Sequence, residues 1–230
     1  MAAWSGAIDC ARRIPADPEA AVALQNRLRH LVVPHNPGTP EFATVAGLDS
    51  AYRADGTVVT AVVVLDARTL EPVETATAAG VASFPYVPGL LAFRELPGSV
   101  AALEKLSTTP DLLVCDGQGI AHPRRFGLAC HLGLLTGLPS IGVAKTVWGD
   151  HEPPGNERGA WSPITIDGEV VGRAVRTRTG VKPVYVSVGH NIDLDTATAQ
   201  VLALAPRHRQ PETTRHADHL CRTLLRELPA

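Results

Sequence analysis

Three β-rich segments in the first half of the chain place the strongest limit on its fold. They are Thr44–Asp49, Thr57–Asp66 and Val73–Val81, separated by short turns that contain Asp55-Gly56 and Glu71-Pro72. Short apolar runs rich in β-branched residues and bounded by turn residues are typical of strands. Strands connected this closely pair with their chain neighbours in the antiparallel sense. The segments therefore predict a three-stranded antiparallel meander.

Helical segments precede and follow this meander. The expected helices run over residues 18–31, from Pro88 to Glu95, from Pro97 to about Leu106, from Pro123 to about Thr136, and over 193–203 and 213–228. The first shows apolar residues at helical spacing. Three of the others begin at a proline, which is favoured in the first turn of a helix because its missing N–H has no partner to lose there.

Strand-like segments alternate with these helices in the second half. They are Leu112–Cys115, Ser140–Val143, Val170–Arg176 and Val184–Val188, with a Gly- and Pro-rich loop at Trp148–Gly159. Strands that alternate with helices are typical of a parallel sheet covered by helices. We therefore expect one mixed α/β domain, in which the meander is extended by parallel strands and helices cover both faces.

Length and composition agree with one soluble domain. The chain has 230 residues, of which 45% are hydrophobic and 19% charged, and its formal net charge is −2. We expect a single domain over residues 17–230 and a flexible N-terminal segment over 1–16. The longest apolar run, Val58–Leu65, is too short to span a bilayer, so no membrane partner is expected. The second half carries more basic than acidic residues, which suits either a phosphate-binding face or an ordinary mixed surface.

The cysteines and the N-terminus bear on the compartment. Cys10, Cys115, Cys130 and Cys221 are far apart and form no CxxC pair, which argues against a zinc site and for reduced thiols. The segment Met1–Arg13 lacks the apolar core of a secretion signal. These features predict a cytoplasmic protein.

Two aspartates stand at the ends of predicted strands. Asp49 closes the first strand and Asp116 closes the strand over Leu112–Cys115. Ligands bind at the carboxyl ends of parallel strands, and carboxylate oxygens suit magnesium. Aspartates in such positions also serve as turn formers or helix caps. Either role is open for each residue alone, and the pair favours a metal site.

The loop Asp116–Arg125 and the residue Lys145 add features that suit a phosphate. Gly117 and Gly119 allow a close approach of the backbone to a ligand, and we expect the helix that begins at Pro123 to point its N–H groups at an anion. His122 is either a substrate contact or a packing residue. Lys145 follows the Ser140–Val143 strand, where it is either a phosphate contact or a surface residue with a buried stem.

An aromatic residue is flanked by prolines in the segment Phe84–Gly89. Pro85 and Pro88 restrict the backbone on both sides of Tyr86. A loop that presents an aromatic ring rigidly is suited to stacking on bases or wedging between them. The alternative is a tyrosine folded back on the core.

Taken in order, these segments resemble the endonuclease V family, which has an RNase H-like fold. The resemblance rests on Asp49, Phe84–Glu95, Asp116–Arg125 and Ile141–Lys145, and extends from about Arg27 to near Leu225. It implies a magnesium site, with manganese as a substitute, and a deoxyinosine 3′ endonuclease activity. The family cuts the second phosphodiester bond 3′ to a deaminated purine such as inosine, and leaves 3′-hydroxyl and 5′-phosphate ends, as a step in DNA repair.

The resemblance also implies a role for individual residues. The metal ligands would be Asp49, Glu95, Asp116 and a fourth residue on the last helix, and the catalytic set would be Asp49, Glu95, Asp116 and Lys145. The family motif places the fourth ligand at Asp218, with His216 as a neighbour, although Thr213 stands where proline is usual. The substrate-binding residues would be Pro85, Tyr86, Gly89, Arg94, Gly117, Gln118, Gly119, His122 and Lys145, with Tyr86 in a strand-separating wedge.

The expected partner is a nucleic acid that contains inosine, either DNA or single-stranded RNA, and the expected state is a monomer. Two other functions fit part of the pattern. The first is a protein that binds inosine-containing strands without cutting them, and the second is a ribonuclease that acts on RNA–DNA hybrids. The four acidic residues argue against the first. The expected wedge and glycine loop argue against the second, because neither is needed to cut an undamaged hybrid.

Overall fold

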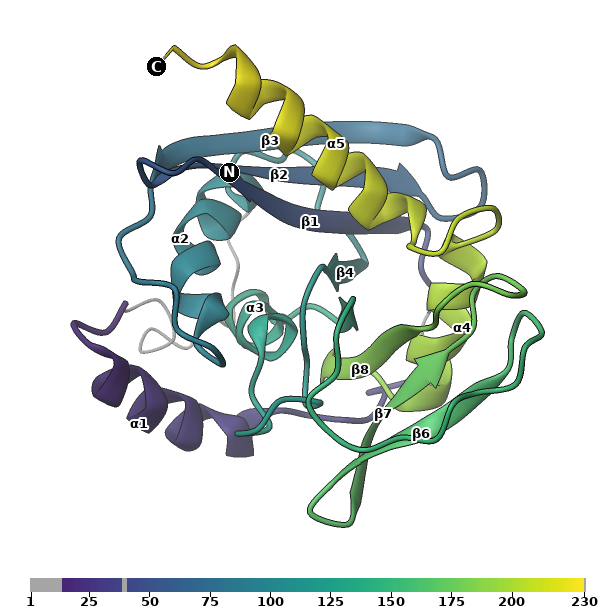
Figure 1. Ribbon diagram of the computed structural model, residues 1–230. Coiled ribbons are helices and arrows are strands. Elements are labelled where there is room, and N and C mark those ends of the chain that lie inside the picture. The colour runs from purple at the N-terminus through teal and green to yellow at the C-terminus, as the bar shows by residue number, and fades with distance from the viewer. Residues whose placement is uncertain (1–13, 39–40, 230) are drawn as a thin grey trace.

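An eight-stranded mixed sheet forms the centre of the molecule in the computed structural model, which describes residues 14–38 and 41–229 (Figure 1). In spatial order the strands are β3-β2-β1-β4-β5-β8-β7-β6. Their bounds are β1 Thr44–Tyr52, β2 Thr57–Asp66, β3 Pro72–Val81, β4 Leu112–Cys115, β5 Ser140–Ala144, β6 Trp161–Ile166, β7 Glu169–Val175 and β8 Val184–His190.

The first five strands follow the expected arrangement. Strands β1, β2 and β3 pair antiparallel as a meander, and β4 and β5 continue the sheet in parallel with β1. Beyond β5 the pairing changes, because β8, β7 and β6 are antiparallel to their neighbours. The expected parallel extension therefore holds for β4 and β5, and the far end of the sheet is a second antiparallel section.

Helices cover both faces of this sheet (Figure 1). Their bounds are α1 Pro18–Leu28, followed by the 3-10 turn η2 Arg29–Leu31, then α2 Leu91–Leu103, α3 Leu128–Thr136, α4 Leu194–Leu204 and α5 Glu212–Glu227. Helices α1, α2 and α3 share one hydrophobic core with Ala46 and Leu48 of β1. Helices α4 and α5 share the other core with Val45 of the same strand. Successive β1 side chains thus alternate between the two cores, as the strand geometry requires.

Two expected helices around Pro88 and Pro97 are one helix. Gly89 has a φ of 80°, which no helix interior accommodates, so α2 begins only at Leu91. Pro97 then lies inside α2, where it removes one backbone hydrogen bond. Leu96 and Leu103, on the two sides of this break, are both buried in the same core. Their packing holds the helix together across the proline.

The helix expected at Pro123 begins later, at Leu128. Arg125 has a φ of 57°, and its N–H donates to the carbonyl of His122, so residues 122–125 form a turn. Two N–H groups at the start of α3 are engaged by the preceding loop: Gly127 donates to the carbonyl of Gly119, and Ala129 donates to that of Gln118. The expected start of this helix at Pro123 is therefore wrong, and an anion contact at its N-terminus stays a prediction.

Two strand assignments also change. β6 was not expected, because Pro163 interrupts it and it follows a Gly- and Pro-rich loop; such a strand is tolerated at the edge of a sheet, where β6 lies. β1 continues to Tyr52, so Asp49 lies inside the strand rather than at its end.

The remaining expectations concern the N-terminal segment, the cysteines and membrane-spanning helices. Most of the expected flexible segment 1–16 lies outside them, and Ile14, the first described residue, packs against the core beside α2. Cys115, Cys130 and Cys221 are buried free thiols. In the part of the chain that the structure describes, no helix has the length and apolar character needed to cross a membrane.

Candidate active site

Asp49 and Asp116 lie side by side where the parallel pairing of β1 and β4 ends. The last paired residues are Leu48 and Cys115, and the next residue along each strand is one of the two aspartates. The Asp116 N–H donates to the carbonyl of Leu48 at 3.3 Å, which holds the start of the following loop against β1. The two carboxylates therefore meet at one edge of the β4 strand, as the sequence predicts.

Glu95 reaches the same place from α2. Its side chain is buried, with an exposed fraction of 7%, and the Tyr52 hydroxyl donates to its Oε1 at 3.3 Å. Tyr52 in turn lies beneath the guanidinium of Arg94, whose Cζ is 4.6 Å from the ring centroid. Burial and two acidic neighbours make this carboxylate costly to ionise, and the hydrogen bond from Tyr52 offsets only part of that cost.

Asp218 approaches from the opposite face of the sheet, on α5. Arg222 Nε donates to its Oδ1 at 2.6 Å, one helical turn further on. Despite the missing proline, α5 begins at Glu212, and Thr213 is fully buried against Gly47 of β1. A Cβ at Gly47 would lie 2.2 Å from the Thr213 backbone, so the glycine allows α5 to approach β1 closely.

Lys145 follows the last residue of β5 and forms an ion pair with Asp116. Its side chain is 43% exposed, and that of Asp116 is 12% exposed. Burial by itself lowers the pKa of the Lys145 ammonium, but Asp116, Asp49 and Asp218 together raise it above its ordinary value. Lys145 therefore stays charged and places one positive group among the acidic residues.

The charges of the site act strongly on one another. Burial, followed by repulsion from Asp116, raises the pKa of Asp49 to about 7, although Lys145 and the Ser50 N–H oppose this. Burial, followed by repulsion from Asp49 and Asp116, raises the pKa of Glu95 to about 8. Asp218 also contributes to the raised pKa of Asp49. The four carboxyl groups named by the sequence thus belong to one electrostatic cluster.

The donor set suits a hard divalent cation, since magnesium and manganese prefer carboxylate oxygens. A cation at this cluster would also relieve the repulsion that raises the pKa of Asp49 and Glu95. In the described residues, however, no three acidic, histidine or cysteine side chains are already arranged to hold a metal. Lys145 instead pairs with Asp116, and Arg222 pairs with Asp218. A bound cation would compete with these two ion pairs.

A cavity of about 500 Å³ opens beside the acidic residues. Asp49, Glu95, Asp116 and Lys145 form one side of it. The remaining walls come from the loop after β3, the glycine loop after β4, the start of α3 and the loop after β5, and they include Tyr86, Val87, Pro88, Gly89, Gly117, Gln118, His122, Leu128, Val147 and Trp148. A volume of this order holds a small organic group such as one base.

Close packing around the glycine loop after β4 excludes a larger residue at two positions, one in the loop and one in the adjacent strand β5. A Cβ at Gly119 would lie 2.0 Å from the carbonyl oxygen of Val188, and one at Gly142 would lie 2.4 Å from the Gly119 nitrogen. The Gly119 N–H donates to Ser187 Oγ at 2.8 Å. Gln118 Nε2 donates to the carbonyl of Thr146 at 2.8 Å, and its Oε1 is buried without a hydrogen-bond partner in the structure. The loop is therefore fixed from both sides.

The Phe84–Gly89 loop is anchored through the carbonyls at its two ends. The Gly89 oxygen accepts hydrogen bonds from Arg124 Nη2 at 2.6 Å, His122 Nε2 at 2.9 Å and Gln25 Nε2 at 3.1 Å. At the other end, Arg94 donates to the carbonyl of Phe84 at 2.9 Å. Between these anchors, Tyr86 is 70% exposed. The loop thus presents the ring to solvent at the cavity rim, and the alternative of a tyrosine folded onto the core is wrong.

His122 braces this loop. Burial and, to a smaller extent, the adjacent Arg124 guanidinium lower its pKa to about 4, so the ring is neutral at neutral pH. One ring nitrogen bonds the Gly89 carbonyl, and the other accepts the Arg124 N–H at 3.2 Å. These contacts agree with the packing role weighed above, and a substrate contact by His122 stays a prediction.

Two residues of this site did not stand out in the sequence. Trp148, 43% exposed, lines the cavity, but it was assigned only to a loop; its position three residues after Lys145 was the available signal. Gln25 is fully buried. Its side-chain amide donates to the carbonyls of Gly89 and Phe126 and accepts from Arg124 Nε. A polar residue on the apolar face of the first helix, between Leu24 and Leu28, was the signal for it.

Comparison with known proteins decides the family. A model of the family described as Endonuclease V matches residues 26–219. An endonuclease V from Nocardia farcinica is 66% identical over 214 residues, covering 93% of this chain and 95% of the relative. The chain belongs to the endonuclease V family.

Solved structures of this family have the same fold. The crystal structure of endonuclease V from Streptomyces avermitilis is 56% identical, with a TM-score of 0.89 over 93% of this chain and 95% of the other. Endonuclease V from Ciona intestinalis, crystallised with a 24mer DNA containing an inosine followed by a ribo-adenosine, is 27% identical, with a TM-score of 0.81 over 93% and 100%. The RNase H-like α/β fold expected from the resemblance is confirmed, and as an endonuclease V family member the protein is a nuclease, hence a hydrolase.

Proposed function

We propose that this protein cuts a nucleic-acid strand next to a deaminated purine such as inosine, in a metal-dependent reaction that serves DNA repair. The proposal rests on one cavity whose walls combine two different features. A cluster of carboxylates with a lysine lies on one side, and a rigid loop with an exposed tyrosine lies on the other. The Ciona relative crystallised with inosine-containing DNA supports the same substrate class.

The carboxylate side is suited to hydrolysis of a phosphodiester. Asp49, Glu95, Asp116 and Asp218 would hold Mg²⁺, or Mn²⁺ in its place, and such a cation makes a water nucleophilic and offsets charge on the leaving oxygen. Lys145, charged and half-exposed beside Asp116, is placed to bind a phosphate oxygen and to stabilise charge that develops on it. The reaction needs no covalent intermediate on the protein.

The other side of the cavity is suited to an extruded base. Tyr86 would stack on a base and so separate the two strands. The backbone of Gly117 and Gly119, with the Gln118 amide, would face the edge of the extruded base. Flipping costs a few kcal/mol of stacking, and least where the base is already mismatched. The family's cut, the second phosphodiester bond 3′ to the lesion, with 3′-hydroxyl and 5′-phosphate ends, is proposed for this chain as well.

The decisive experiment uses end-labelled strands with one inosine, as DNA and as RNA, incubated with the purified protein in Mg²⁺, in Mn²⁺ and in chelator. We expect one metal-dependent cut, 3′ of the inosine, and no cut in matched strands without it. Asp116→Asn should remove cutting and retain binding, whereas Asp167→Asn, the same change on a remote turn, should retain both. Binding without cutting in either metal would establish the binding-protein alternative.

Tyr86 variants separate the proposal from a general ribonuclease on hybrids. Tyr86→Ala should lower the preference for the inosine strand by about 10-fold, since stacking on an aromatic ring contributes about 1–3 kcal/mol per base. Tyr86→Phe keeps the ring and should keep the preference. If Tyr86→Ala discriminated as well as the unaltered protein, or if an RNA–DNA hybrid without inosine were cut at an equal rate, the wedge assignment would be wrong.

A further inference from the structure

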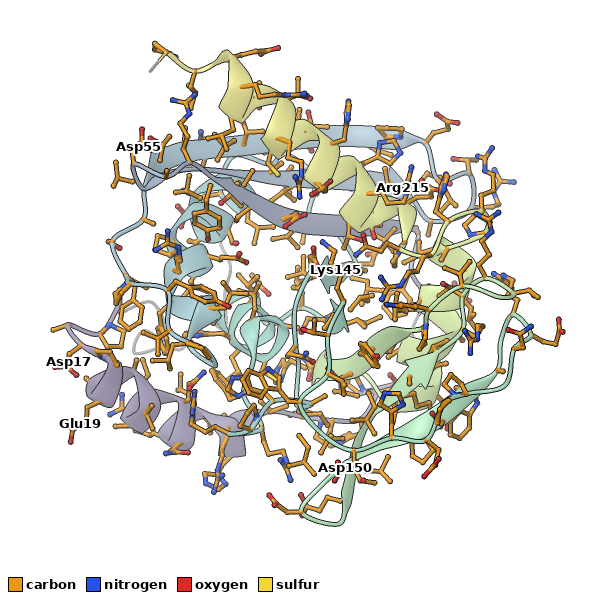
Figure 2. All side chains as sticks on the ribbon, in the orientation of Figure 1. Asp17, Glu19, Asp55, Lys145, Asp150 and Arg215 are labelled. Carbon is orange, nitrogen blue, oxygen red and sulfur yellow. The ribbon has the colours of Figure 1, made fainter. Side chains whose placement is uncertain are left out.

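A second cavity, of about 760 Å³, is lined by Asp218, one of the four carboxylates. Its floor is the end of β1, from Ser50 to Tyr52, and its wall is the outer face of α5. Three arginines of that helix, Arg215, Arg222 and Arg226, line it together with His219 (Figure 2 labels Arg215). We refer to Ser50–Tyr52 with these four α5 residues as the α5 groove.

The basic residues of the α5 groove form one stripe along the helix. Positions 215, 219, 222 and 226 follow the spacing of a single helical face, and all four side chains are exposed. The stripe is roughly 16 Å long, from a rise of about 1.5 Å per residue. Acidic groups near it are Glu212, which pairs with Arg215 at 3.3 Å, and Asp218, which pairs with Arg222 at 2.6 Å. The outer end, at Arg226, carries the least compensated positive charge of this stripe.

The fold gives little reason for these arginines. Arg226 Nη2 donates to Thr223 Oγ1 at 3.3 Å, a long contact on the helix surface. Arg53, by contrast, donates to the carbonyls of Leu225 and Leu228 and secures the end of α5. Exposed pairs within one helix contribute little to stability. Guanidinium groups presented to solvent along a groove are instead suited to binding phosphates.

The α5 groove is continuous with the acidic cluster. Asp218 lines the groove, and its charge acts on Asp49, which lines the first cavity. The groove floor starts at Ser50, whose N–H donates to Asp49 Oδ1 at 2.8 Å. The α5 groove is therefore the neighbouring surface on the Asp218 side of the acidic cluster.

We propose that the α5 groove binds the phosphodiester backbone of the cleaved strand on the 3′ side of the cut. This rests on the proposed function: a lesion base held in the first cavity and a cut 3′ to it place the following nucleotides beyond the carboxylates. At about 3.4 Å per nucleotide along a duplex strand, the stripe covers about five nucleotides. The groove reads no bases and adds affinity by charge.

The test measures binding by fluorescence anisotropy in chelator, where no strand is cut. Inosine-containing single strands share one 5′ segment and carry about two or about eight nucleotides 3′ of the inosine, on either side of the length that the stripe covers. The unaltered protein should bind the longer strand more tightly. Arg226→Ala should weaken that binding by about 3- to 10-fold, leave the shorter strand unaffected, and reduce the salt slope by about 0.7 for the lost contact.

Arg27→Ala is the matched control. Arg27 is an exposed arginine in the last turn of α1, as Arg226 is in the last turn of α5, but α1 packs on the opposite face of the sheet. It should leave both affinities unchanged. The proposal is overturned if the two variants behave alike, or if Arg226→Ala weakens binding of the shorter and the longer strand equally. A failure to cut inosine-containing strands in the presence of metal would instead count against the proposed function. Binding is measured in chelator and cutting is measured in metal, so the two failures are distinguishable.

Discussion

Burial and repulsion act in the same direction on Asp49 and Glu95, and this makes both residues a source of instability in the metal-free protein. Each is expected to ionise only near neutral pH, because the neighbouring carboxylates cannot all be charged in a half-buried site. Perturbed acids of this kind cluster where proteins do chemistry. Here the perturbation arises from residues that the sequence had already singled out one by one, although it gave no measure of their distance from one another.

This predicts a specific pH dependence of stability in chelator. Because the folded pKa of Asp49 is raised from 3.8 to about 7, the folded state binds protons more tightly than the unfolded state. Stability should therefore fall as pH rises from about 4 to about 8, with a loss in Tm of roughly 10 °C. Asp49→Asn should make the dependence less steep, with the remainder due to Glu95, whereas Asp167→Asn should leave it unchanged. A melting temperature that rises over this pH range, or an equally steep Asp49→Asn profile, would contradict the assignment.

The loop after β4 has no regular secondary structure and is held in place by close packing. Its glycines are enclosed between β5, β8 and the start of α3, so the backbone itself forms the wall of the cavity. The sequence indicated a close approach at Gly117 and Gly119, but assigned it to a ligand. The structure shows that at Gly119 the approach is to Val188 of β8.

Gly119→Ala should therefore be strongly destabilising. Its Cβ would lie 2.0 Å from a backbone oxygen, which cannot rotate away, so either β8 or the loop must move. We expect a loss of about 3 kcal/mol in the free energy of unfolding, at the upper end of overpacking effects. Gly80→Ala in edge strand β3, where a Cβ meets no atom within 4 Å, should change stability by less than about 0.5 kcal/mol. Denaturant unfolding of both variants checks this; equal stabilities would refute the packing argument.

The local sequence pattern predicted the type of most helices and strands correctly, but it did not predict all of their boundaries. The first five strands and the first and last helices lie close to where apolar spacing places them. Three of the errors fall at prolines: Pro97 lies within α2, Pro123 precedes α3 by a turn, and Pro163 lies in the unexpected β6. In each case a proline's local preference was outweighed by packing around it or by a neighbouring residue, such as Arg125 with its positive φ. Such contacts are long-range and have no local signal.

At the scale of the whole molecule, the acidic site joins both faces of the sheet. Asp49 and Asp116 come from neighbouring strands, Glu95 from a helix on one face and Asp218 from a helix on the other. The ligand set itself was expected from the resemblance, residue by residue. Its distribution over two hydrophobic cores required the strand order β1-β4, which pattern alone leaves open. A cation at this position would link the two layers.

Magnesium should for that reason raise the melting temperature. At about 100 times its Kd, a ligand stabilises the folded state by about 2.7 kcal/mol, which corresponds to roughly 5–10 °C for a chain of this length. Asp218→Asn should reduce the gain, and Asp167→Asn should show the full gain. Calorimetry in chelator and in Mg²⁺ provides the measurement. A gain that Asp218→Asn leaves intact would remove α5 from the site.

The pairing of β1 with β4 also sets when the site can exist during folding. In the chain, β2, β3 and α2 lie between Leu48 and its partner Cys115, and Asp218 comes from the last helix. Contacts between residues so distant in the chain form late, because a long loop must close before they add stability. A chain that has formed its local hairpins and helices therefore still has no assembled cleavage site. We therefore expect the acidic cluster to be complete only when folding is nearly complete.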